Sequence, residues 1–118
     1  GSNPSRVCGT LHYADADGDH HNSGAQCYSF FGETFSDEFH VFSIIWDEEH
    51  IAWYLDDQKF NEERFDDLNL DGAPNPFQKE FYFLMNVAVG GHYDGDPNAS
   101  TVFPQKMEVD YIRVFQEN

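Results

Sequence analysis

The sequence predicts an all-β fold, and three stretches of alternating side chains lead to that prediction. Two runs, 81–89 and 107–115, alternate with a period of two and are joined by a loop dense in Gly, Asp, Asn and Pro. A third run, 39–46, alternates in the same way, turns through 47–50 and returns over 51–55. We therefore expect antiparallel strands connected by turns.

Composition and charge limit the possible partners. Of the 118 residues 40% are hydrophobic, which suffices for the core of a single domain. With 22 acidic against 6 basic residues the formal charge is −16, which repels phosphate backbones, so we expect no nucleic acid partner. No apolar run approaches the length of a membrane span, so we expect no membrane partner either. A neutral polymer suits this charge better.

The first expected strand covers 7–13. Alternation places Cys8, Thr10 and His12 on one face of it and the apolar residues on the other. A single His on a strand is more often a hydrogen-bonded structural residue than a functional one. The pattern alone therefore favours a structural His12.

The segment 15–24 follows with a D-x-D-x-D spacing that could wrap a hard cation. It fails the helix-loop-helix calcium pattern, because His20 stands where Gly is required and Gln26 where a bidentate Glu is required. We expect a solvated hairpin loop. His20 and His21 would diverge on a strand, so a metal site built on both is weaker still.

Cys8 and Cys27 flank this hairpin. A symmetric fold-back about Asp19 would place Cys8 opposite a residue near Phe30, so a disulfide requires an asymmetric loop or a bulge. The pairing is left open by the pattern.

The hairpin 39–55 carries both tryptophans of the chain, and it turns tightly again at Asp56 and Asp57. Trp46 and Trp53 could both be core residues, and His40 is expected to be structural. The segment 61–70 that follows is expected to be a short helix or an irregular excursion with a charged, solvated face. No apolar surroundings are evident there that would raise one carboxyl pKa for acid–base work.

The two C-terminal runs each carry one unusual polar residue. In 81–89 the less bulky face holds Asn86, which would floor a groove or simply satisfy a neighbouring backbone group. In 107–115 Asp110 lies among aromatic and branched residues, and a carboxylate there needs a partner that neutralises it.

Four segments together resemble glycoside hydrolase family 16, which contains the laminarinases (endo-beta-1,3-glucanases) and lichenases. They are VCGTLHY (7–13), FHVFSIIWDEEHIAWYLDD (39–57), FLMNVAVGG (83–91) and FPQKM followed by VDYIRV (103–114). The resemblance implies an antiparallel β-sandwich with jelly-roll, concanavalin-like topology. Such sandwiches take about 200 to 250 residues, so residues 1–118 are expected to be the C-terminal half of one such domain.

The resemblance also implies roles for single residues. The His that matches His12 lies in the cleft near the catalytic acid/base, and the Trp that matches Trp46 reaches the cleft, where an indole can stack on a sugar ring. We expect His12, Trp46 and Asn86 to bind substrate, and Trp53 less so. Asp110 matches a residue that often holds one structural calcium, with the other ligands in the N-terminal half; no organic cofactor is expected.

The catalytic residues of that family form an E-x-D-x-(x)-E motif, which this chain lacks. Retention requires two carboxyls about 5–5.5 Å apart, so we expect the pair upstream or on a companion chain, and this chain alone to be inactive. The expected protein is a secreted endo-beta-1,3-glucanase whose partners are beta-glucan and the N-terminal half of its domain. The alternatives are a non-catalytic, lectin-like module that uses the same groove, and a piece that self-associates through exposed edges.

Overall fold

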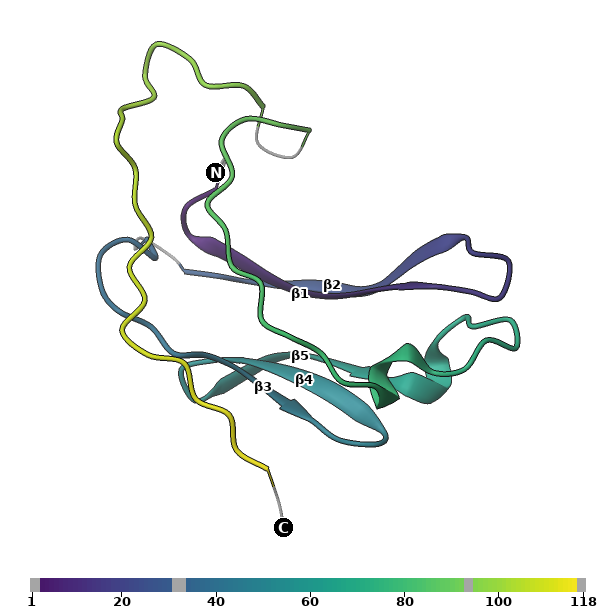
Figure 1. Cartoon of the computed structure of the whole chain (residues 1–118). Helices are drawn as coiled ribbons and strands as arrows, with labels where there is room; N and C mark the ends of the chain where they lie inside the picture. The colour runs from purple at the N-terminus through teal and green to yellow at the C-terminus, as the bar shows by residue number, and fades with distance from the viewer. Residues whose placement is uncertain (1–2, 31–33, 93–94, 117–118) are drawn as a thin grey trace. The chain divides into compact units, whose positions relative to one another are not determined.

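The computed structural model describes residues 3–30, 34–92 and 95–116 (Figure 1). The chain divides into two compact units, residues 1–81 and 82–118. All strands of the described residues lie in the first unit, and all are antiparallel. The predicted all-β class is confirmed, since the helical segments described are two short 3-10 turns.

The first sheet is the hairpin of β1 (Arg6–Ala14) and β2 (His20–Ser29). The pair Ala14–His20 closes its turn, which centres the fold-back on Asp17 and not on Asp19. Farther along, Thr10 alone faces two residues of β2, Gly24 and Ala25, both at positive φ. This is a β-bulge with the extra residue on β2.

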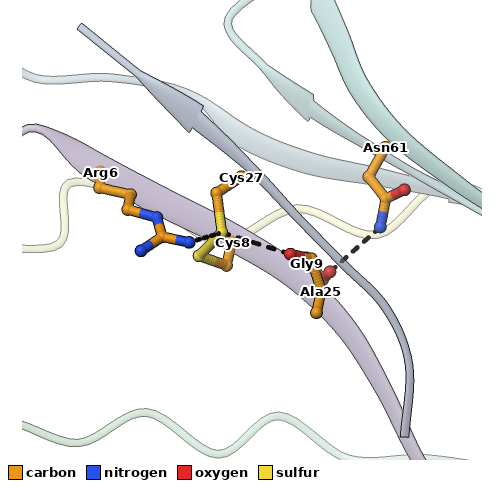
Figure 2. Close-up of a disulfide and its surroundings, with 6 residues drawn as sticks. All are labelled: Arg6, Cys8, Gly9, Ala25, Cys27 and Asn61. Atoms are coloured by element: carbon orange, nitrogen blue, oxygen red, sulfur yellow. Dashed lines mark hydrogen bonds between the residues drawn. A yellow bond between two sulfur atoms is a disulfide. The ribbon is translucent and has the colours of Figure 1, made fainter. Parts of the chain in front are cut away.

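The earlier turn and the bulge bring Cys8 directly opposite Cys27, and the two form a disulfide with their Cα atoms 4.1 Å apart. Figure 2 shows this bridge with the guanidinium of Arg6 beside it, Nη2 lying 3.0 Å from Cys27 Sγ. The bulge that a disulfide was expected to require is therefore present. The sequence-based prediction placed Cys8 opposite a residue near Phe30 because it assumed a turn centred on Asp19.

The second sheet has the order β3-β4-β5, with bounds Phe42–Trp46, His50–Leu55 and Gln58–Arg64. Asp47 caps the first turn by accepting hydrogen bonds from the amides of Glu49 and His50, and Asp56 adopts a positive φ in the second. The predicted hairpin is confirmed over 42–55, whereas residues 39–41, predicted as the start of its first strand, precede β3. The prediction for 61–70 is wrong in its first part, because β5 continues through Arg64 before the 3-10 turns Phe65–Asp67 and, farther on, Pro76–Gln78.

The core lies between the two sheets of the first unit. Its buried members come from β1, β4 and the two 3-10 turns: Leu11, Tyr13, Ile51, Phe65, Leu68 and Phe77. Gly9 on β1 allows the Trp53 ring of β4 to lie close to the β1 backbone, since a Cβ at Gly9 would be 2.5 Å from that ring. Buried Asn61 on β5 then donates from Nδ2 to the Gly9 carbonyl oxygen across the sheets at 3.0 Å, as Figure 2 shows. The first unit is thus a small antiparallel sandwich.

The second unit carries the two alternating runs that predicted strands, and that prediction is wrong for the described structure. Neither 82–89 nor 107–115 is a strand, and their large apolar residues are exposed, Leu84 at 83% and Val114 at 68%. Alternation assigns side chains to two faces, but a strand exists only when a neighbour takes up its N–H and C=O groups. The described residues supply no such neighbour.

Candidate functional site

The candidate site begins with His12, which points away from the core. Its neighbours Leu11 and Tyr13 are buried between the sheets, so alternation puts the imidazole on the free face of the β1–β2 sheet, where it is exposed. The predicted placement of Cys8, Thr10 and His12 on one face agrees with this register.

A second imidazole accompanies His12 on that face. His12 Nδ1 lies 3.1 Å from Nε2 of His20, and the rings are stacked with centroids 5.3 Å apart. Nothing in the local pattern indicates this pair, because it depends on the register of the hairpin. Once the register is known, the pair can be read from it: His12 lies opposite Asn22, and His20 is two residues before Asn22 on the same face of β2.

The loop before His20 is organised by a carboxylate. Asp15 Oδ1 accepts hydrogen bonds from the amides of Asp17 and Asp19 at 3.0 and 2.9 Å, and Oδ2 lies 2.7 Å from His21 Nε2. The hydrogen bond from His21, and then those from the two amides, lower the pKa of Asp15 below its usual value of 3.8. Residues 16–20 are exposed, which confirms the expected solvated loop, and Asp15 organises its backbone.

The two tryptophans lie in different surroundings. Trp46, at the end of β3, is 38% exposed and meets Phe81 edge-on with ring centroids 5.3 Å apart. Trp53, on β4, is half-buried against the core and beside Gly9. Trp46 thus has the more accessible indole, as a sugar platform requires, and the substrate roles of both residues stay predictions.

Asn86 and Asp110 lie in the second unit, and both are exposed. Asn86 is not on a strand, so its place on a groove floor stays a prediction. Asp110 has no cluster of ligands around it, because the part of the chain that the structure describes contains no group of three or more His, Cys, Asp or Glu able to hold a metal ion. A calcium ligand role for Asp110 stays a prediction.

Two glutamates of β5, Glu62 and Glu63, are engaged in local pairs. Glu62 accepts from Lys59 Nζ at 2.6 Å, which lowers the pKa of Glu62, and Glu63 accepts from the Ser23 hydroxyl. A general acid requires a raised carboxyl pKa. The lowered pKa of Glu62 does not suit a general acid, and the place of the catalytic pair stays a prediction.

Two shallow hollows lie in the first unit, apart from these residues. One of about 450 Å³ is lined by Asp47, Glu48, Phe77 and Gln78, and one of about 470 Å³ by Thr34, Asp37, Glu38 and His40. Neither hollow is lined by a residue that was predicted to bind substrate or metal. His40, which was expected to be structural, lines the second hollow, and its Nδ1 lies 3.2 Å from Asp56 Oδ2. No helix of the described residues is long and apolar enough to cross a membrane.

Comparison with known proteins gives one family. The model of glycosyl hydrolases family 16 matches residues 1–113. Among curated relatives, the chain is 39% identical to glucan endo-1,3-beta-glucosidase A1 of Niallia circulans, 38% to the beta-glucanase of Rhodothermus marinus and 32% to the glucan endo-1,3-beta-glucosidase of Cryptopygus antarcticus. These matches cover 97%, 98% and 100% of the chain, but only 17%, 41% and 47% of the respective relatives.

The chain therefore spans less than half the length of each of these relatives. No solved structure matches it.

Proposed function

The chain belongs to glycosyl hydrolases family 16, and we propose from this that it forms part of a retaining endo-glycosidase that cleaves beta-1,3-glucan. The observation that carries the proposal is the exposed imidazole of His12, on the free face of a sheet whose other face is sealed by the core. An exposed imidazole there supports the role that the resemblance implies for His12, near the catalytic acid/base. Relatives named as glucan endo-1,3-beta-glucosidases support beta-1,3-glucan as the substrate.

In this proposal the chain binds the glucan but does not carry the reacting carboxylates. His12 offers a ring nitrogen to a sugar oxygen, Trp46 offers an indole face, and Asn86 offers an amide. The glutamate pair belongs to a segment upstream in sequence or to a companion chain, which is also the partner we propose for the second unit. The local pairing of Glu62 with Lys59 and of Glu63 with Ser23 supports this assignment.

Two further properties belong to the proposal. Asp110 would contribute an oxygen ligand to one structural calcium whose remaining ligands lie outside the described residues, and oxygen donors are what calcium prefers. The Cys8–Cys27 disulfide supports a secreted protein, because such bridges persist in oxidising compartments.

The test is hydrolysis of laminarin, followed by its release of reducing ends, in the protein that joins this chain to the glutamate pair. His12→Ala and Asn86→Ala should each lower kcat/KM by about tenfold or more, the loss expected for one hydrogen bond to a polar ligand. His50→Ala, which removes an imidazole from the β3–β4 turn, should leave the rate unchanged. Wild-type rates in both site variants would contradict the assignment of the groove.

Native mass analysis of the same material separates the alternatives. A companion polypeptide together with activity agrees with the proposal. A chain that binds laminarin without releasing reducing ends, even when the companion is present, would identify a lectin-like module, and a homo-oligomer that does not bind laminarin would identify self-association.

A further inference from the structure

The free face of the β1–β2 sheet carries two imidazoles, and the ladder explains why they meet. His12 pairs with Asn22 and His20 pairs with Ala14. Residues two apart on one strand share a face, so His20 is the diagonal neighbour of His12. Diagonal neighbours are within reach of aromatic side chains, and these two stack with an interplanar angle of 21°.

The ring of His20 is positioned by the turn that precedes it. Asp15 fixes that turn with both carboxylate oxygens, one on the amides of Asp17 and Asp19 and one on His21. His21 also stacks on buried Tyr13, with centroids 5.6 Å apart. Because His21 is committed to the inner face, its neighbour His20 is directed to the free face.

The contact between the rings links their tautomers. A hydrogen bond between two ring nitrogens needs one proton between them, so His12 Nδ1 and His20 Nε2 cannot both carry one. A neutral histidine in water carries its proton mainly on Nε2. If His20 keeps that form, its Nε2–H donates to His12 Nδ1, and the proton of His12 is then held on Nε2.

We propose that His20 is a positioning residue for His12. Its Nε2–H fixes the ring and the tautomer of His12, so that His12 presents an Nε2–H donor to an oxygen of the bound glucan. The identification of the ligand as a glucan rests on the proposed function, whereas the pairing of the two rings does not. His20 itself need not touch the substrate.

Two variants of His20 separate its two contacts. His20→Phe keeps a ring that can stack on His12 but removes the donor, and His20→Gln keeps an N–H donor without the imidazole. We expect the ¹⁵N resonance of His12 Nδ1 to report an unprotonated, hydrogen-bonded nitrogen in the wild-type chain and in His20→Gln. In His20→Phe it should move toward the position of an imidazole nitrogen without a bond, and His50→Ala should not move it.

A wild-type His12 that carries its proton on Nδ1 would overturn the positioning role, because the hydrogen bond would then run from His12 to His20. An Nδ1 resonance that is the same in wild type and in His20→Phe would overturn the pairing itself. This measurement uses the 118-residue chain and no glucan. It therefore stands apart from the proposed function.

The second measurement is laminarin hydrolysis in the protein that carries the glutamate pair. His20→Phe should lower kcat/KM about tenfold, His20→Gln should retain most of the rate, and His12→Ala with His20→Phe should be no slower than His12→Ala alone. If His12→Ala slows hydrolysis and His20→Phe does not, the positioning role is wrong and the proposed function stands. If neither variant slows hydrolysis while the resonance moves in His20→Phe, the proposed function of this face is wrong and the pairing stands.

Discussion

The hairpin of residues 6–29 and the segment 82–116 differ in structure although both contain two strand-like runs joined by a polar loop. In the hairpin, β1 and β2 are paired along their length and one face is buried. In 82–116 the described residues form no strand, and the apolar side chains are exposed. The comparison teaches that alternation decides which side chains share a face. Whether two runs pair as strands depends on the turn that connects them and on the core that covers one face.

Three features of the hairpin supply that closure. Its turn, 15–19, is short and capped by Asp15, its strands are joined by a disulfide, and its inner face packs on β4 and the 3-10 turns. The two runs of 82–116 are separated by the longer loop 90–106, and closing a longer loop costs more chain entropy. With no core partner among the described residues, nothing offsets that cost.

The largest expected effect on stability comes from removing the Cys8–Cys27 disulfide, a covalent link that the second unit lacks. Cys8→Ser with Cys27→Ser should lower the free energy of unfolding of the first unit by about 3 kcal/mol, because the bridge closes a loop that otherwise adds entropy to the unfolded chain. Urea unfolding measures this, and a reducing agent should shift the wild-type midpoint equally. An unchanged midpoint would mean that packing alone maintains the hairpin.

A smaller effect should follow from crowding the contact between the sheets. The Cβ introduced by Gly9→Ala would lie 2.5 Å from the Trp53 ring, so we expect a loss of about 1–3 kcal/mol. The same substitution in a Trp53→Leu background should cost less, since the ring is gone. Equal costs in the two backgrounds would show that Trp53 does not seal this face.

The smallest effect concerns the charge in the turn. The folded-state pKa of Asp15 lies below its unfolded value near 3.8, so the carboxylate stabilises the folded hairpin fully above that pH and loses this contribution as the pH falls through the folded value. Thermal unfolding at pH 6 and at about pH 3 should therefore show a smaller acid loss in Asp15→Asn than in wild type. An identical acid loss in both would place the acid sensitivity elsewhere.

Local pattern predicted the strands with strong alternation, and it placed His12 on the correct face of its strand. It failed for β5, whose residues are mostly polar and whose pairing is set by the turn at Asp56 and by buried Asn61. It could not find the His12–His20 pair, because the register depends on the Asp15 turn and the bulge at Gly24. For 82–116 the predicted strands are absent from the described structure, since partner strands are not encoded in the runs themselves.

The measurement that tests the central claim most directly is amide hydrogen exchange across the chain, alone and joined to the segment that we propose carries the glutamate pair. Asn86 can floor a glucan groove only if 81–89 becomes a strand. In the chain alone we expect protection in β1, β2 and β4 and fast exchange over 82–89 and 107–115. In the joined protein both segments should become protected, whereas fast exchange there in an active glucanase would contradict the account.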